Sequence, residues 1–257
     1  MHEDSAKETA GTALSLLDLT DLTDDCDAAA IEKLCRQAQT PFGNTAAICI
    51  WPRFVTQARG ILGKDHAVKI ATVVNFPSGE LAVADVVAET RQAIADGADE
   101  IDLVIPYRAL IAGNEAAVTG MVTAVKAASP PPVILKTILE TGEIGDPALI
   151  RKASDLAIAA GSDLIKTSTG KVAVNATLPA AEVMLTAIRD SGKPVGFKPA
   201  GGVRTVADAG AYLALAASIL GEGWATPKTF RFGASGLLGD ILAVLGGGAA
   251  PAAPASY

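Results

Sequence analysis

Short apolar runs alternate with longer amphipathic segments along most of the chain. Eight apolar runs have the length of β-strands: Leu14–Leu19, Thr45–Ile50, Val68–Asn75, Glu100–Ile105, Val133–Leu139, Asp163–Thr167, Val195–Pro199 and Thr229–Gly233. The intervening segments with helical periodicity include Leu81–Ala95, Ala148–Ala160, Ala180–Arg189 and Val206–Leu220. Strands that alternate with helices form parallel βαβ units, and eight such units in about 250 residues predict a closed (β/α)8 TIM barrel. A doubly wound open sheet is the alternative fold.

The two ends of the chain differ from its middle. Residues 1–13 are small and polar, and we expect them to form a short leading helix. Residues 246–257 are rich in Gly, Ala and Pro, which predicts a flexible tail. No stretch resembles a linker, and α/β barrels reach about 250 residues as one domain, so residues 1–257 are predicted to form a single domain.

Composition narrows the class of protein. Half of the 257 residues are hydrophobic but only 4% are aromatic, so Ala, Val, Ile and Leu must fill the core. The formal net charge of −7 argues against a nucleic-acid-binding protein, which would need a basic surface. It does not argue against a small anionic substrate, because a site can be locally positive on an acidic protein.

The cysteines and the N-terminus indicate where the protein resides. The three cysteines, Cys26, Cys35 and Cys49, form no CxxC pair, which argues against a zinc site or a disulfide framework. The acidic N-terminus lacks the apolar run of a signal peptide, and no stretch of about 18 apolar residues could span a membrane. We expect a soluble, cytoplasmic protein. His2 and His66 are not placed to build a metal site, so no metal is expected.

Charged residues occur within strands that should be apolar. The strands of a parallel barrel are covered on both faces, so a charge within one is unfavourable unless it is paired. Five predicted strands carry such a charge: Asp18, Asp102, Lys136, Lys166 and Lys198. Because side chains alternate between the faces of a strand, Lys166 shares a face with the small Ser168, and Lys198 shares one with Gly196. Such companions suit a crowded barrel interior, where the lysines would converge.

Two of these charges occupy matching positions. Asp102 follows Gly97 by the same five residues that separate Lys166 from Gly161. Each glycine ends a predicted helix, so the two side chains are expected at similar heights and facing the same way. Asp102 could serve only as a structural cap or ion pair, and Lys136 is as well explained as its structural partner as by any other role.

Two buried lysines close together favour chemistry over structure, since two ammonium groups repel each other. An ordinary lysine, with a pKa of about 10.4, is mostly protonated at neutral pH and cannot attack a carbonyl. Burial and a neighbouring cation both lower that pKa. Two lysines and a carboxylate therefore supply a nucleophile, a cation that tunes it and a proton shuttle. The imine formed would act as an electron sink for breaking an adjacent carbon–carbon bond, and this chemistry needs no cofactor.

Three predicted strands end in loops that contain glycine. These loops are Thr167–Lys171, Pro199–Arg204 and Gly233–Gly236. Backbone N–H groups in such loops bind anions, and the last two loops follow the seventh and eighth strands, the usual phosphate site of barrels. Any one of them is as often an ordinary turn, but three beside two lysines predict a phosphate site.

The sequence resembles the deoxyribose-phosphate aldolase family from about Leu14 to Leu245. The runs that carry the resemblance are GNTAAICIWPRF, ATVVNFPSG, ETRQAIADGADEIDLVIPYRALIAGNE, IRKASDLAIAAGSDLIKTSTGKVAVNAT and VGFKPAGGVRT. The resemblance implies a carbon–carbon lyase that reversibly cleaves 2-deoxy-D-ribose 5-phosphate to D-glyceraldehyde 3-phosphate and acetaldehyde, without a cofactor, in deoxyribonucleotide catabolism and carbohydrate degradation. It also makes a homodimer reasonable.

The resemblance implies roles for particular residues. Lys166 in KTSTGK is the Schiff-base lysine, Lys198 in GFKPAGG is the second lysine that perturbs it, and Asp102 in DEIDLVIP is the proton donor and acceptor. The residues expected to bind phosphate or to line the substrate site are Asp18, Thr20, Cys49, Lys136, Thr167, Gly170, Lys171, Gly201, Gly202, Arg204, Gly233, Ser235, Gly236 and Tyr257. Cys49 is equally well explained as a small buried hydrophobic residue.

Two positions near the C-terminus need comment. Gly236 stands where relatives often carry a second Ser, so one side-chain contact to phosphate would be missing, although the backbone N–H remains. The chain ends in Tyr257, as relatives' tails do, and we hypothesise that Tyr257 folds back toward the phosphate pocket. Two other functions stay open: a Schiff-base aldolase for a different phosphorylated sugar, and a non-catalytic barrel that binds sugar phosphates.

Overall fold

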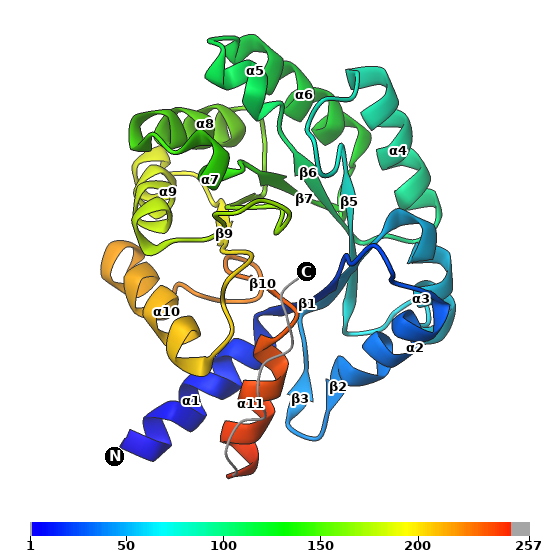
Figure 1. Cartoon of the computed structure of the whole chain (residues 1–257), viewed down its shortest axis with the longest axis vertical. Coiled ribbons are helices and arrows are strands. Elements are labelled where there is room, and N and C mark those ends of the chain that lie inside the picture. The colour runs from blue at the N-terminus through cyan, green and yellow to red at the C-terminus, as the bar shows by residue number, and fades with distance from the viewer. Residues whose placement is uncertain (1, 248–257) are drawn as a thin grey trace.

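Eight parallel strands form a barrel at the centre of the molecule, and helices surround it (Figure 1). The computed structural model describes residues 2–247. The barrel strands are β1 (Leu17–Asp21), β4 (Ala47–Ile50), β5 (Lys69–Val74), β6 (Glu100–Val104), β7 (Ile134–Ile138), β8 (Leu164–Lys166), β9 (Gly196–Lys198) and β10 (Phe232–Ala234). They are hydrogen-bonded in the order β10-β1-β4-β5-β6-β7-β8-β9, and bridges from Phe197 to Phe230 and from Ala200 to Gly233 close the sheet. The predicted TIM barrel is confirmed, and the open sheet is wrong.

Helices connect successive strands on the outside of the barrel. They are α1 (His2–Ser15), α2 (Ala28–Gln37), η1 (Pro52–Phe54), α3 (Val55–Leu62), α4 (Val83–Ala95), α5 (Tyr107–Ile111), α6 (Glu115–Ala128), α7 (Thr141–Ile144), α8 (Pro147–Ala159), α9 (Leu178–Ser191), α10 (Val206–Leu220) and α11 (Leu237–Gly246). A short hairpin, β2 (Gln39–Thr40) and β3 (Gly43–Asn44), projects between α2 and β4. The four predicted helices correspond to α4, α8, α9 and α10, with ends within two residues.

The first predicted strand begins too early. Leu14 belongs to α1, which extends through Ser15, and β1 starts only at Leu17. The reason is packing: Ala10, Ala13 and Leu14 recur at helical spacing and are all buried, so the leading helix is longer than the predicted residues 1–13. Apolar residues at a helix end and at a strand start are indistinguishable by hydrophobicity alone.

The last predicted strand also begins too early. Thr229 lies in a turn, where its hydroxyl donates to the carbonyl of Trp224, and β10 starts at Phe232. The hydroxyl competes with strand pairing by bonding to the local backbone. At the C-terminus α11 ends at Gly246, and the expected flexible tail otherwise falls at residues 248–257, outside the described part of the chain.

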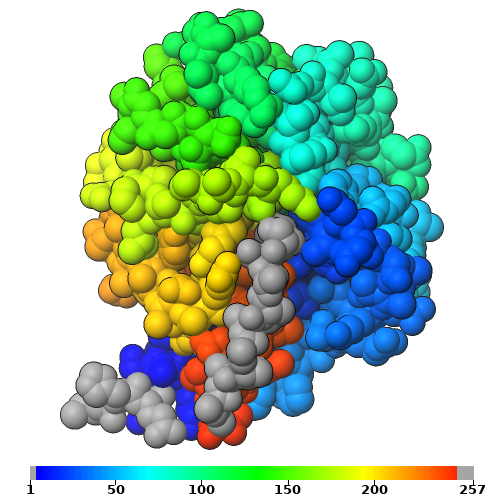
Figure 2. Space-filling model, in the orientation of Figure 1, coloured from blue at the N-terminus to red at the C-terminus, as the bar shows by residue number. Residues whose placement is uncertain are grey.

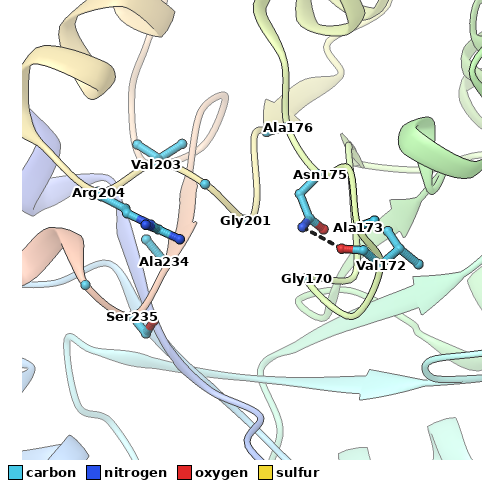
Figure 3. Close-up of a pocket in the computed structure, with 12 residues that line it drawn as sticks. Gly170, Val172, Ala173, Asn175, Ala176, Gly201, Val203, Arg204, Ala234 and Ser235 are labelled. Atoms are coloured by element: carbon cyan, nitrogen blue, oxygen red, sulfur yellow. Dashed lines mark hydrogen bonds between the residues drawn. The ribbon is translucent and has the colours of Figure 1, made fainter. Parts of the chain in front are cut away.

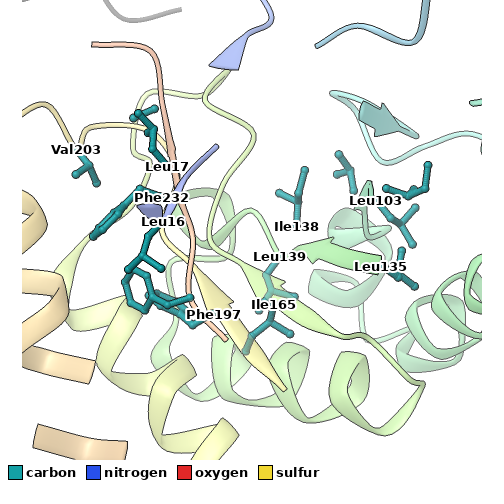
Figure 4. Close-up of a cluster of buried hydrophobic side chains, with 14 of the residues drawn as sticks. Leu16, Leu17, Leu103, Leu135, Ile138, Leu139, Ile165, Phe197, Val203 and Phe232 are labelled. Carbon is teal, nitrogen blue, oxygen red and sulfur yellow. The ribbon is translucent and has the colours of Figure 1, made fainter. Parts of the chain in front are cut away.

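The core lies mainly between the barrel and its helices. Side chains that point outward from the strands, such as Leu135, Ile165 and Phe197, pack with Leu16 and Phe232 in one buried cluster (Figure 4). Inside the barrel a small second cluster comprises Leu22, Cys49, Ala71 and Val73. Strand alternation therefore places Phe197 toward the helices and its neighbour Lys198 in the barrel interior, where Lys198 was predicted.

The loops that follow β8 cross one face of the molecule. In Figure 2 the yellow-green segment reaches across this face to the blue N-terminal part, and Lys171 Nζ lies 3.5 Å from Asp24 Oδ1. This face carries the C-terminal ends of the strands, where barrel enzymes hold their active sites. Within residues 2–247, no helix combines the length and the apolar character needed to cross a bilayer.

Candidate active site

Seven charged side chains from six strands and their flanks meet inside the barrel. They are Asp18, Glu100, Asp102, Lys136, Lys166, Lys198 and Arg231. None of these residues is more than 7% exposed. All five charges predicted from the strand pattern lie in this group, which we call the interior charge cluster.

Asp102 is the centre of the cluster. Its Oδ2 accepts hydrogen bonds from Lys166 Nζ and Lys198 Nζ, each at 2.8 Å. Its Oδ1 accepts from Lys136 Nζ, also at 2.8 Å. Burial favours the neutral form of a carboxyl group, but the three lysines outweigh burial and hold the pKa of Asp102 well below its usual range. Asp102 is therefore ionised in the resting protein.

Asp18 anchors the second lysine. Its Oδ2 lies 2.5 Å from Lys198 Nζ, and its Oδ1 accepts from an Arg231 guanidinium nitrogen at 2.7 Å. Arg231 also binds both oxygens of Glu100, at 2.8 and 3.2 Å, and Glu100 lies 2.6 Å from Lys136 Nζ. The carboxylates are thus surrounded by cations, which lower the pKa values of Asp18 and Glu100 although burial opposes this.

The two catalytic candidates among the lysines differ in their surroundings. Lys198 contacts two carboxylates, Asp102 and Asp18, and these outweigh burial and raise its pKa well above the usual value. Lys166 contacts Asp102 alone. Burial and the charge of Lys198 together outweigh that single carboxylate and lower the pKa of Lys166. The ammonium form is therefore held more firmly at Lys198 than at Lys166, and Lys166 is the more easily deprotonated of the two.

The side chains of Asp102 and Lys166 point the same way, as predicted, but the two residues do not lie at the same level along the barrel. In the sheet register Asp102 pairs with Lys136, whereas Lys166 pairs with Ile138, two residues further along the same strand, and with Lys198. The stagger of barrel strands still brings the Lys166 nitrogen to the Asp102 carboxylate. Both side chains face the interior, as predicted, but they start from different levels.

A cavity of about 290 Å³ lies beside the cluster, between the loops that follow β8, β9 and β10. Six residues expected to bind phosphate line it: Gly170, Gly201, Gly202, Arg204, Ser235 and Gly236. Gly201 and Gly202 have φ values of 76° and 88°, so glycine is required at both positions for this backbone path. Figure 3 shows Arg204 and Asn175 on opposite sides of the cavity, with Gly201 between them.

Two features make this cavity suited to an anion. Gly236 is the N-cap of α11 and no side chain caps that helix, so its first N–H groups are available at the cavity edge. Arg204 adds a guanidinium group that can bind phosphate through two hydrogen bonds. We call this cavity the phosphate pocket. It lies close to Lys198 along the chain, because Gly201, which lines it, is three residues after Lys198.

Residues 12–238 match the sequence model of the DeoC/LacD family of aldolases. The chain belongs to this aldolase family. A protein from Agrobacterium fabrum strain C58 named deoxyribose-phosphate aldolase is 65% identical to it over 251 residues, which are 98% of this chain and 97% of the relative.

Solved structures agree with the fold of the aldolase. The apo form of a protein from Toxoplasma gondii ME49, provisionally named a deoxyribose-phosphate aldolase, aligns with a TM-score of 0.87 at 26% identity, covering 95% of this chain and 99% of that one. A deoxyribose phosphate aldolase from Aeropyrum pernix, described as tetrameric, aligns with a TM-score of 0.73 at 21% identity, covering 93% and 97%. The second likeness is evidence for the barrel alone.

Three further predicted residues of the aldolase, Thr20, Cys49 and Thr167, are buried on or directly after barrel strands. The Thr167 hydroxyl accepts a hydrogen bond from the backbone N–H of Ala200 at 3.0 Å, which ties the loops after β8 and β9 together. Thr20 is buried on β1 and bonds to the Asp18 carbonyl. Cys49 is fully buried on β4, and burial raises the pKa of its thiol. Tyr257 lies outside the described residues.

Gly233 and Lys171 have distinct placements in the aldolase. A Cβ atom on Gly233 would lie 3.0 Å from Lys198 Cε and 2.8 Å from the Ala200 side chain, so glycine leaves room for the lysine. Lys171 points away from the phosphate pocket, with its Nζ 5.7 Å from the ring centre of Trp51 and near Asp24. It links the loop after β8 to the opposite side of the barrel mouth.

Sequence reasoning missed several charged or polar members of the site. Glu100 and Arg231 fall within predicted strands, each two residues before a selected position, Asp102 and Gly233, so the same alternation would have found them. Glu140 gave no comparable signal. It has a φ of 60°, and its buried carboxylate accepts from the Thr169 hydroxyl at 2.5 Å and backbone N–H at 3.2 Å.

Proposed function

We propose that this aldolase cleaves 2-deoxy-D-ribose 5-phosphate to acetaldehyde and D-glyceraldehyde 3-phosphate, with Lys166 as its nucleophile. The observation that carries the assignment is the contrast between the lysines of the cluster. Lys166 has one carboxylate partner and keeps 3% of its side chain exposed, whereas Lys136 and Lys198 have several partners and none exposed. Lys166 is therefore both the most easily deprotonated of the three and the most accessible.

The position of the phosphate pocket relative to the Lys166 amine sets the orientation of the substrate. Lys166 ends β8, and the phosphate pocket opens along the loops that follow β8, β9 and β10. An open-chain pentose 5-phosphate has its aldehyde and its phosphate at opposite ends. With the phosphate held by Arg204 and the backbone N–H groups near Gly236, the aldehyde carbon extends toward Lys166.

The reaction begins at the aldehyde carbon. The free amine of Lys166 attacks C1, and the carbinolamine that forms loses its oxygen as water to give an iminium ion. The C3 hydroxyl then gives up its proton, the C2–C3 bond breaks, and the electron pair flows into the iminium nitrogen. D-glyceraldehyde 3-phosphate leaves, and an enamine of acetaldehyde stays on Lys166. Protonation of the enamine at C2 and addition of water release acetaldehyde and restore the amine.

Asp102 is the proposed proton carrier for these steps. It is ionised in the resting protein and lies 2.8 Å from the Lys166 nitrogen, so it can accept the proton that the amine loses on attack. Through a bridging water, Asp102 could also transfer protons to the carbinolamine oxygen and to C2. Lys198 stays protonated beside it and stabilises the negative charge of Asp102 between transfers.

The alternative function is that of a Schiff-base aldolase acting on a different phosphorylated sugar. Its only support is that the matching DeoC/LacD family model describes aldolases without naming one substrate. The 65% identity with a deoxyribose-phosphate aldolase supports the first assignment.

Turnover with defined substrates tests the proposed function. The wild-type protein is expected to release acetaldehyde from 2-deoxyribose 5-phosphate, detected with alcohol dehydrogenase and NADH, and to leave fructose phosphates intact. Lys166→Met is expected to be inactive, while the exposed control Lys33→Met keeps full activity. Cleavage of a fructose phosphate in preference to deoxyribose phosphate would overturn the substrate assignment.

We further propose a single-domain, cytoplasmic enzyme of deoxyribonucleotide catabolism that acts as a homodimer without nucleic-acid partners. One barrel that includes strands from Leu17 to Ala234 supports the single domain. Three free, buried cysteines and a net charge of −7 support the cytoplasmic location and the lack of nucleic-acid binding. Cell fractionation and sedimentation of the purified protein test these assignments.

A further inference from the structure

The interior charge cluster has a fixed charge balance that depends on Lys166. Three carboxylates, Asp18, Glu100 and Asp102, face four basic side chains, Lys136, Lys166, Lys198 and Arg231. If Lys166 were protonated, the cluster would contain one uncompensated positive charge. With Lys166 neutral, three negative and three positive charges balance. A buried net charge is far less stable than a balanced set, so the balanced state is favoured.

Arg231 is the member of the cluster that makes this balance rigid. A lysine can lose its proton in a low-dielectric site, but a guanidinium group stays charged in proteins. The Arg231 Nε–H donates to the Pro227 carbonyl at 2.6 Å, and the guanidinium group binds Asp18 and Glu100. Glu100 in turn neutralises Lys136 at 2.6 Å. Neither Arg231 nor Glu100 is paired with Lys166.

We propose that Arg231 and Glu100, although neither contacts Lys166, together set its protonation state. The positive charge of Arg231 favours loss of the Lys166 proton, and the negative charge of Glu100 opposes that loss. This inference rests on the proposed function, since it assumes that Lys166 is the reacting amine. Both residues are positioning residues, because they act through Asp18, Asp102 and Lys136 rather than on the substrate.

Other titratable groups face Lys166 and must be considered. Asp102 approaches from β6, Lys198 from β9 and Cys49 from β4. Glu140 approaches from the segment after β7. Burial raises the pKa values of Cys49 and Glu140, which favours their uncharged forms. Because these groups are the same in every variant below, they cancel when the variants are compared.

The charge balance predicts opposite effects for the two residues. Arg231→Met leaves two fixed cations against three carboxylates, so Lys166 retains its proton to a higher pH. Glu100→Gln leaves three cations against two carboxylates, so Lys166 loses its proton at a lower pH. The double variant again has equal numbers of each sign with Lys166 neutral. A purely structural role would reduce activity in both single variants and would not move the pH profile in opposite directions.

The test measures the rate at which borohydride traps acetaldehyde on Lys166 as a function of pH, with the label located by mass spectrometry. Relative to wild type, the midpoint should rise by about one pH unit or more in Arg231→Met, fall in Glu100→Gln and return near the original value in the double variant. Arg231→Lys, which keeps the charge, should change the midpoint little. Lys228→Met, which removes an exposed cation from the same loop, should leave it unchanged.

The outcomes separate the two proposals. If Lys166 is labelled in every folded variant but the midpoints coincide or move in the same direction, the charge-setting pair is wrong and the proposed function stands. If wild-type Lys166 is not labelled at any pH, the proposed function itself fails. Should Arg231→Met not fold, the comparison of wild type with Glu100→Gln still decides, because the inference requires the midpoint to fall in Glu100→Gln.

Discussion

Replacing Lys198 by methionine removes the cation nearest to the proposed nucleophile while keeping an unbranched side chain of similar length. Asp102 would keep Lys166 and Lys136, and Asp18 would keep Arg231 and Lys136, so no buried carboxylate loses all of its partners. We therefore expect Lys198→Met to fold.

The size of the effect follows from the geometry. The Lys166 and Lys198 nitrogens each lie 2.8 Å from the same oxygen, Asp102 Oδ2, so they are at most twice that distance apart. At a separation of about 5 Å and an effective dielectric constant of about 20, Coulomb's law gives a repulsion of roughly 3 kcal/mol. Losing it favours protonated Lys166 and reduces the reactive amine about a hundredfold at neutral pH.

The assay is kcat/KM for cleavage of 2-deoxyribose 5-phosphate between about pH 6 and 10. Lys198→Met is expected to lose about two orders of magnitude near pH 7 and to recover much of this loss as the pH rises. Lys33→Met, which removes an exposed lysine, serves as the control for the change in net charge. A loss that is equal at every pH would refute the electrostatic reasoning, because it would mean that Lys198 acts other than by tuning Lys166.

Three further predictions concern the pocket and the cluster. Gly233→Ala should crowd Lys198, whose Cε lies 3.0 Å from the added methyl group, and should lower kcat about tenfold at a stability loss of about 1–3 kcal/mol in denaturant unfolding; an unchanged kcat would contradict it. Arg204→Ala should raise KM for the phosphorylated substrate about tenfold, whereas Gly236→Ser should lower it, with trapping of acetaldehyde unaffected in both. Lys166→Met should remove a pH dependence of stability. Between the lowered pKa of Lys166 in the folded protein and its ordinary pKa of 10.5 in the unfolded chain, the folded wild type binds fewer protons than the unfolded chain. The free energy of unfolding of the wild type, measured relative to the variant, should therefore rise with pH across this range and level off above pH 10.5. A difference that falls with pH would show that the pKa of Lys166 is raised instead.

The barrel and the central charges could be predicted because both are local patterns. A buried strand needs a run of apolar residues, and a charge such as Lys166 within that run stands out without knowledge of its partners. Alternation then assigns the charge to a face. These two patterns were enough to predict that Asp18, Asp102, Lys136 and Lys198 face the barrel interior.

The contacts between those charges could not be predicted, because they depend on relations between strands. Lys166 reaches Asp102 through the stagger of the barrel, although the two residues pair with different levels of β7. Lys198 has two carboxylate partners and Lys166 only one because Asp18 on β1 reaches Lys198 and not Lys166. Hydrophobic patterning does not encode these distances. The prediction that Lys166 is the nucleophile therefore rests on the family resemblance and on the presence of a second buried lysine, Lys198.

The left-handed backbone of Glu140 is a second feature that patterning could not find. Non-glycine residues rarely adopt a positive φ, and no turn motif marks the segment after β7. Its carboxylate binds Thr169, whose hydroxyl accepts from the Lys171 N–H at 3.0 Å, and so supports the loop that carries Gly170. Such a contact between two loops becomes visible only when the strands that carry them are placed side by side.

The central claim is that Lys166 forms the covalent intermediate. The protein is incubated with acetaldehyde and sodium borohydride at neutral pH, digested, and mapped by mass spectrometry, with Lys166→Met treated in parallel. The account predicts one ethylated lysine, Lys166, in the wild type and loss of that rapid modification in the variant. Rapid modification at Lys198 or Lys136 with Lys166 unmodified would contradict it.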